Sequence, residues 1–169
     1  MARSIALTLL LGLILLPTAS AVADEEASPV TSLPRLTLDS ALTVARAALA
    51  ACRREGAQVA VTVVDRAGQT QVVLRDDLAP DLTVDISDRK AYTAVTFARA
   101  TSALAGRFPG AYSVPKVERV MIAAGGVPIQ AAGRLYGGVG VSGAPSGELD
   151  ERCARVGVAA VADALEMLD

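Results

Sequence analysis

Two hairpin patterns restrict most strongly what this chain can fold into. The first spans residues 58–75, where two runs rich in β-branched side chains flank a turn at Arg66–Gly68. The second spans residues 127–141 and turns at Gly133. Strands joined by such short turns pair antiparallel, so the sequence predicts an antiparallel sheet of about four to five strands.

Three stretches with a helical spacing of apolar residues surround these hairpins. The first follows Thr37, a candidate N-cap, and stops at Gly56. The second is expected over residues 87–104 with Ser87 as its cap, and the third begins at about Ser146. The order helix, hairpin, helix, hairpin, helix predicts an α+β fold in which helices flank the antiparallel sheet.

The start of the chain has the features of a secretory signal. A basic residue precedes an apolar run over residues 5–16, and small residues then favour cleavage after Ala23. The apolar run is shorter than the ~20 residues that cross a bilayer, which disfavours an uncleaved anchor. We expect a periplasmic or secreted protein. Its predicted parts are a signal peptide over residues 1–23, a flexible lead-in over residues 24–35 and one domain over residues 36–169.

Charge and composition exclude several partners and chemistries. Removing residues 1–23 takes one Arg from the 16 basic residues and none of the 18 acidic residues, which leaves a net charge near −3. No basic run remains and aromatic residues make up 3% of the chain, so no nucleic-acid partner is expected. The chain contains no histidine. Any metal ligand or general base must therefore come from carboxylates, Lys, Tyr, Thr, Cys or the backbone.

The segment from Gly125 to Cys153 is where we first expect a ligand. A β run, a loop of small residues and an acidic helix start follow one another there. The unpaired N–H groups of such a loop and helix start can bind an anion. The groups expected to contribute are those of Ser142, Gly143, Ser146 and Gly147.

Three shorter patterns have both a structural and a functional interpretation. Gly137–Gly140 superficially matches a dinucleotide fingerprint, but it lies in a strand pattern without a βαβ unit, so close approach of a backbone or flat ligand is favoured. Ser87 and Lys90 match a serine–lysine pair whose partner motifs are absent, which favours a helix cap. Asp65 fits an Asx-type turn. The enzymatic alternative uses Asp65 and Lys90 as acid and base.

Two cysteines, Cys52 and Cys153, lie on the apolar stripes of the first and last predicted helices. An exported protein permits them to form a disulfide, and antiparallel packing of the two helices would bring the thiols close together. A buried, reduced pair is the alternative. The sequence leaves both possibilities open.

Six motifs follow one another in order along the predicted domain. They are Val63–Gly68, Ser87 with Lys90–Ala94, Pro109–Tyr112, Gly125–Ile129, Gly137–Gly143 and Gly147–Glu151. In this order they resemble the GlcG/HbpS family of heme-binding or heme-degrading domains, over residues 36–168. The resemblance implies a profilin-like α+β domain that assembles into homo-oligomers, often hexamers or octamers. Some members bind heme and act with a membrane sensor kinase.

The resemblance implies heme or another tetrapyrrole as the ligand, although this chain lacks the axial histidine that a related domain supplies. A threonine ligand in one member points to Thr101, and Tyr112 is the alternative because phenolate binds ferric heme. The propionates are expected to meet Lys90, Arg134 or the N–H groups of Ser142–Gly147. A second interpretation is an oligomeric accessory protein of a periplasmic redox or sensor system that binds no heme.

Overall fold

The computed structural model describes residues 28–108 and 114–168. The chain divides into two units between Thr31 and Ser32. In the first unit only residues 28–31 are described, and they form neither helix nor strand. The predicted signal peptide and Tyr112 lie outside the described residues. No described helix has the length and apolar character needed to cross a membrane.

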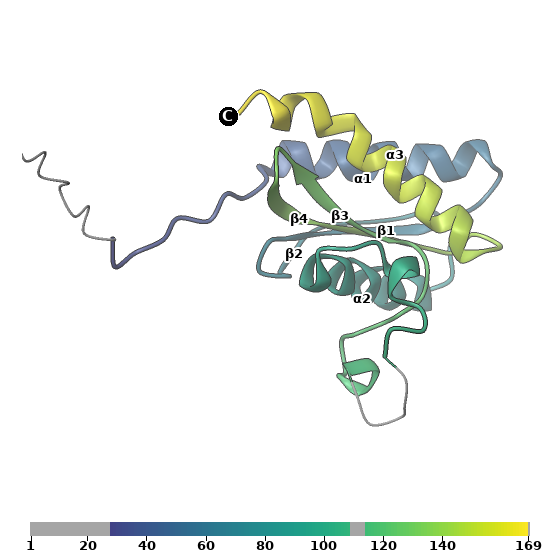
Figure 1. Ribbon diagram of the computed structural model, residues 1–169. Coiled ribbons are helices and arrows are strands. Elements are labelled where there is room, and N and C mark those ends of the chain that lie inside the picture. The colour runs from purple at the N-terminus through teal and green to yellow at the C-terminus, as the bar shows by residue number, and fades with distance from the viewer. Residues whose placement is uncertain (1–27, 109–113, 169) are drawn as a thin grey trace, which may run out of the picture. The chain divides into compact units, whose positions relative to one another are not determined.

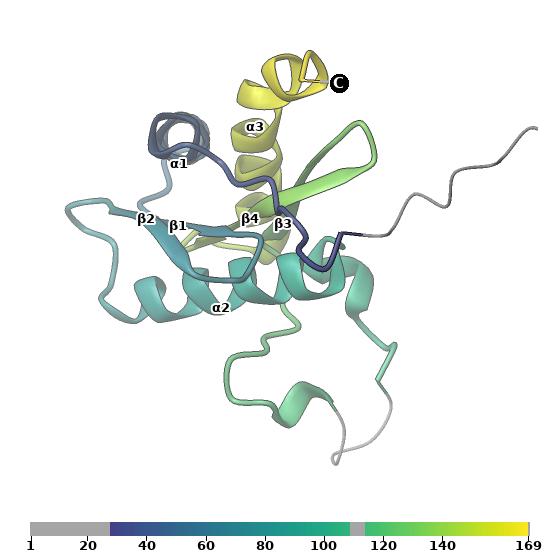
Figure 2. The same cartoon turned by 90° about the vertical axis from the view of Figure 1, so that its left-hand side faces the viewer.

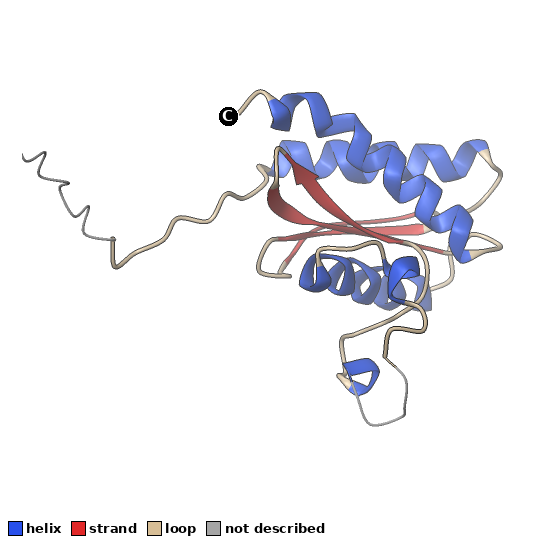
Figure 3. Ribbon diagram, viewed as in Figure 1, coloured by secondary structure: helices blue, strands red, loops and turns tan. Residues whose placement is uncertain are grey.

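Four antiparallel strands in the second unit form one sheet in the order β2-β1-β4-β3 (Figure 3). β1 (Ala60–Asp65) and β2 (Thr70–Arg75) form the first predicted hairpin, and β3 (Gly126–Ala131) and β4 (Arg134–Ser142) form the second. The inner strands β1 and β4 pair with each other, which joins the hairpins side by side. The predicted α+β class and the antiparallel sheet are confirmed.

Three helices cover the two faces of this sheet. α1 (Leu38–Arg54) and α3 (Gly147–Glu166) pack together on one face, and α2 (Leu82–Phe97) lies on the other (Figures 1 and 2). The larger apolar core lies between the sheet and the α1–α3 layer. Val44 of α1 and Val61 of β1 are fully buried in this core. Each such side chain contributes about 1.5–3 kcal/mol to folding.

α2 lies close to β4 because that strand presents glycines to the helix. A Cβ atom at Gly140 would lie 2.0 Å from the carbonyl oxygen of Ser87, and one at Gly138 would lie 2.6 Å from that of Ala91. No larger residue fits at this spacing between helix and strand. Gly138 and Gly140 therefore form a helix-packing surface, which is the close backbone approach that the sequence predicted for this run.

α2 begins earlier than the sequence predicted. Its first residue is Leu82, so the prediction that Ser87 caps the helix is wrong. Ser87 is fully buried in the middle of α2, and its hydroxyl lies 2.8 Å from the Thr62 hydroxyl of β1. Ser87 therefore serves tertiary packing, because a buried hydroxyl needs a hydrogen-bond partner.

α2 also ends earlier than predicted. Ala98 adopts the left-handed conformation, with φ 47° and ψ 40°, and its N–H and that of Arg99 bond back to the last turn of the helix. The predicted continuation to Leu104 is therefore wrong. Thr101–Leu104 instead form a separate 3-10 turn.

A disulfide joins the two helices that share a face of the sheet. Cys52 lies near the end of α1 and Cys153 near the start of α3, with 2.13 Å between their Sγ atoms and 5.5 Å between their Cα atoms. The helices run in opposite directions, which brings these positions together (Figure 1). The bond links residues 101 positions apart. Closing so long a loop stabilises a fold by about 4–5 kcal/mol in the chain-entropy account.

Candidate functional site

The loop in which the sequence predicted an anion site already holds a carboxylate of the protein itself. Asp150, in the first turn of α3, accepts a hydrogen bond from the N–H of Ala144 at 3.0 Å. Its second oxygen lies 2.9 Å from Nζ of Lys90, which also donates to the carbonyl of Val141 at 3.0 Å. Lys90 and Asp150 are both buried. Burial raises the pKa of Asp150, although Lys90 and the loop N–H groups act in the opposite direction.

The start of α3 is satisfied internally as well. Ser146 caps the helix by accepting the N–H of Leu149 at 3.3 Å. The Glu148 carboxylate accepts hydrogen bonds from its own N–H and from the Ser146 hydroxyl, which lower the pKa of Glu148. An incoming anion would meet two carboxylates here. Ser142, Gly143, Ser146 and Gly147 are therefore poorly placed to bind one.

Thr101 lies at the edge of the sheet and is wholly buried. Its hydroxyl donates to the carbonyl of Ala123 at 2.6 Å and accepts the N–H of Gly126 at 2.9 Å. Gly126 begins the edge strand β3, and its N–H is taken up by Thr101. Pro128 in the same strand has no N–H. Neither residue can therefore donate a hydrogen bond to another strand at this edge. Thr101 would reach iron only after breaking both hydrogen bonds.

Asp65 and Lys90 do not meet in one site. Asp65 accepts the N–H groups of Ala67 and Gln69, each at 2.9 Å, and forms an ion pair with Arg35. This arrangement is the Asx-type turn that the sequence predicted. Lys90 is paired separately with Asp150. The acid–base pair of the enzymatic alternative is therefore not assembled.

Arg134 is also far from the other predicted ligand contacts. It begins β4, whereas Ser142 ends the same strand. Strands rise by about 3.3 Å per residue, so the two positions are about 25 Å apart. Arg134 instead lines a hollow with Arg66 and Leu33.

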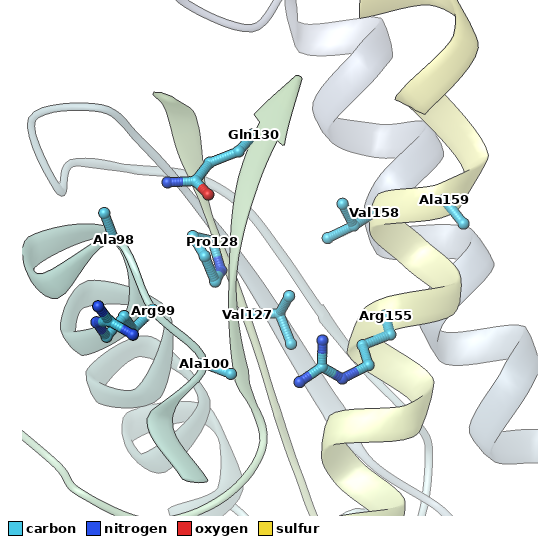
Figure 4. Close-up of a pocket in the computed structure, with 9 residues that line it drawn as sticks. All are labelled: Ala98, Arg99, Ala100, Val127, Pro128, Gln130, Arg155, Val158 and Ala159. Atoms are coloured by element: carbon cyan, nitrogen blue, oxygen red, sulfur yellow. The ribbon is translucent and has the colours of Figure 1, made fainter. Parts of the chain in front are cut away.

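A groove that the sequence did not predict lies along the outer edge of β3, and we call it the β3 groove (Figure 4). Its volume is about 460 Å³, within the range of about 300–1,000 Å³ that is typical of small-molecule sites. The segment after α2 forms one wall, α3 forms the other, and β3 lies between them. The lining residues are Ala98, Arg99, Ala100, Val127, Pro128, Gln130, Arg155, Val158 and Ala159.

Two arginines give the β3 groove its positive charge. The Arg155 guanidinium extends from α3 toward Val127 and donates to Glu151 at 2.7 Å. Glu151 also accepts the N–H and the hydroxyl of Ser102, at 3.3 and 2.9 Å. Burial alone would raise the pKa of Glu151, but the hydrogen bonds from Arg155 and Ser102 lower it. Arg99 has no side-chain partner among the described residues.

The early end of α2 creates this groove. The left-handed Ala98 takes the chain out of the helix, so Arg99 stands on a short segment beside β3 rather than on a further helical turn. Sequence reasoning missed Arg99 and Arg155 because neither belongs to a motif. The only local signal is the pair of small residues, Ala98 and Ala100, that flank Arg99.

A comparison with known protein families decides the relationship of this chain. The family described as "Haem degrading protein HbpS-like" matches residues 36–159. The chain belongs to the HbpS-like family. The family resemblance inferred from the sequence motifs is thereby confirmed, and the match spans α1, the sheet, α2 and most of α3.

Several HbpS-like relatives are similar over most of their length. A double mutant of Streptomyces reticuli HbpS is 44% identical, with a TM-score of 0.74 over 85% of this chain and 97% of that chain. A crystal structure of a PduOC:heme complex is 30% identical, with a TM-score of 0.68 over 75% of this chain and 94% of that chain. An uncharacterized 15.0 kDa protein from the dhaT-dhaS intergenic region of Citrobacter freundii is 34% identical over 113 residues, 64% of this chain and 80% of that protein.

Proposed function

We propose that this HbpS-like protein binds a flat amphipathic carboxylate, with heme or another tetrapyrrole as the main candidate, in the β3 groove. The observation that carries the proposal is the pairing of apolar lining with an arginine on each wall. A planar ring would bury apolar surface against Pro128, Val158 and Ala159, at about 25 cal/mol per Å². Arg99 and Arg155 would hold its carboxylates through charge-assisted hydrogen bonds.

The two arginines are suited to different parts of this task. Arg99 carries a guanidinium without a partner among the described residues, so a ligand carboxylate need not displace an existing ion pair. Arg155 is held by Glu151, which keeps its guanidinium at the groove. A carboxylate that binds Arg155 must share it with Glu151 or replace Glu151. The PduOC:heme complex supports a tetrapyrrole because that protein is a relative with the same fold.

We also propose that the protein acts outside the cytoplasm, after cleavage of the predicted signal peptide. The disulfide between Cys52 and Cys153 supports this location, because disulfides persist in oxidising compartments. As the family resemblance implies, we further propose that the protein forms a homo-oligomer and acts with a membrane sensor partner. Light scattering of the purified protein would measure the oligomeric state.

Titration of the purified protein with hemin tests the proposed site. We expect a saturable change in the Soret band, and Arg99→Leu and Arg155→Leu should each weaken binding by about tenfold. Arg46→Leu is the matched control, because Arg46 is an exposed arginine on α1 outside the groove lining. The proposal fails if no saturable change is seen, or if both groove variants bind hemin as tightly as the unaltered protein.

A further inference from the structure

The β3 groove offers contacts to the edge of a tetrapyrrole but no ligand to its metal. Its lining consists of three alanines, two valines, two arginines, one proline and one glutamine. Proteins hold heme iron through His, Cys, Met or Tyr. Among the residues that the structure describes, none of these lines the groove; the chain has no histidine, and both cysteines are bonded to each other.

Other possible iron ligands in the described part of the chain lie outside the groove lining, and four of them are already engaged. Tyr136 is buried in the core between the sheet and the α1–α3 layer. Tyr92 lies under the guanidinium of Arg119, 4.4 Å from its ring centroid. Lys90 is paired with Asp150, and the hydroxyl of Thr101 makes two backbone hydrogen bonds. Each side chain would have to leave these contacts to bind iron.

We infer that the β3 groove recognises a tetrapyrrole through its carboxylates and its ring face, independently of the central metal. The inference rests on the proposed function and narrows the ligand class to porphyrin-like dicarboxylates, with or without a metal. Without an axial bond from the protein, the central metal contributes nothing to the contacts between the ring and the groove. Removing the metal then leaves the contacts with Arg99, Arg155 and the apolar lining unchanged.

Competition between hemin and metal-free protoporphyrin IX tests this inference. The protein has no tryptophan whose fluorescence could report binding. The fluorescence of protoporphyrin IX is therefore used to follow its displacement by hemin. We expect the two Kd values to agree within about threefold. Arg99→Leu and Arg155→Leu should weaken both ligands by the same factor, about tenfold. Protoporphyrin IX dimethyl ester, which lacks free carboxylates, should bind at least about tenfold more weakly than the free acid.

Two variants complete the experiment. Arg46→Leu should leave the affinity for both porphyrins unchanged. Tyr112→Phe should not weaken hemin binding, because the inference assigns no role to a phenolate ligand. Any one of three results would overturn the inference. Hemin could bind more than about tenfold more tightly than protoporphyrin IX, Tyr112→Phe could lose hemin affinity, or the ester could bind as tightly as the free acid. Failure of both porphyrins to bind would instead contradict the proposed function itself.

Discussion

α3 contributes to two polar regions little more than a turn apart, and they differ in how exposed their charged groups are. At the start of the helix, Asp150 is buried against Lys90 and the loop before α3. Farther along, the Arg155 side chain is 57% exposed and has Glu151 as its ion-pair partner. The first region has a recognisable motif but already contains carboxylates of the protein, whereas the second has no motif but opens onto the β3 groove. A local motif shows what kind of group a loop can bind. The surrounding fold decides whether that group is a side chain of the protein or an external ligand.

The largest predicted effect is on the free energy of unfolding and concerns the buried region at the start of α3. Lys90→Met should lower the free energy of unfolding by about 3–5 kcal/mol, because it leaves Asp150 buried without its counter-charge. Urea unfolding measures the change. Adding Asp150→Asn should restore at least half of the loss, since the amide oxygen still accepts the N–H of Ala144. A loss below about 1 kcal/mol would show that the Lys90–Asp150 ion pair contributes no more to stability than an exposed pair does.

Acid should act on the two regions with opposite sign. The pKa of Glu151 is lowered in the fold, so its contribution to stability is present at neutral pH and is lost as the pH falls below about 5. The pKa of Asp150 is raised, so the folded protein binds a proton there more readily than the unfolded chain, and acid favours folding through this group.

Stability curves from pH 7 down to pH 3 measure this difference. Glu151→Gln should flatten the acid-induced fall in the urea midpoint, whereas Asp150→Asn should make it steeper. The measurement contradicts the assignment if both substitutions change the slope in the same direction.

A smaller effect tests the competition for Arg155. Glu151→Gln should raise the affinity for protoporphyrin IX by about two- to fivefold, because it removes the anion that pairs with Arg155 at the groove. Competitive titration measures the change. Glu148→Gln is a matched control on the same helix, since Glu148 interacts with its own N–H and Ser146 instead. Unchanged or weaker binding in Glu151→Gln would mean that Glu151 does not compete.

The smallest predicted effect concerns the backbone that forms the groove wall. Ala98→Gly should raise the free energy of unfolding by about 0.5 kcal/mol, because glycine adopts a φ of 47° without strain but loses more entropy on folding. Ala100→Gly, at a φ of −58°, should instead lower it by about 0.5–1 kcal/mol. Thermal unfolding compares the two variants. Equal shifts in the same direction would exclude strain at Ala98.

The sequence predicted those parts of the fold that depend on local chemistry. The two hairpins, the Asx-type turn at Asp65 and the helix that Thr37 caps all follow from residues within a few positions of one another. The limits of α2 depend on tertiary contacts. Ser87 is held inside the helix by Thr62 of β1, and no glycine marks the left-handed turn at Ala98.

The candidate site was harder to predict for the same reason. Ser142–Gly147 has the local pattern of an anion-binding loop, but Asp150 accepts the N–H of Ala144 and Glu148 interacts with the Ser146 hydroxyl, so two carboxylates of the protein already lie there. Arg99 and Arg155 come from segments far apart in the sequence, and β3 between them forms the floor of the groove. Such convergence is a property of the assembled sheet and helices rather than of any one segment.

The Cys52–Cys153 disulfide also determines how the domain responds to tension applied at its two ends. All four strands and α2 lie between these cysteines in the sequence. A pull along the chain enters through α1, crosses the sulfur–sulfur bond and leaves through α3. The sheet is therefore outside the path of the load, and until the bond is reduced only the segments before Cys52 and after Cys153 can be drawn out.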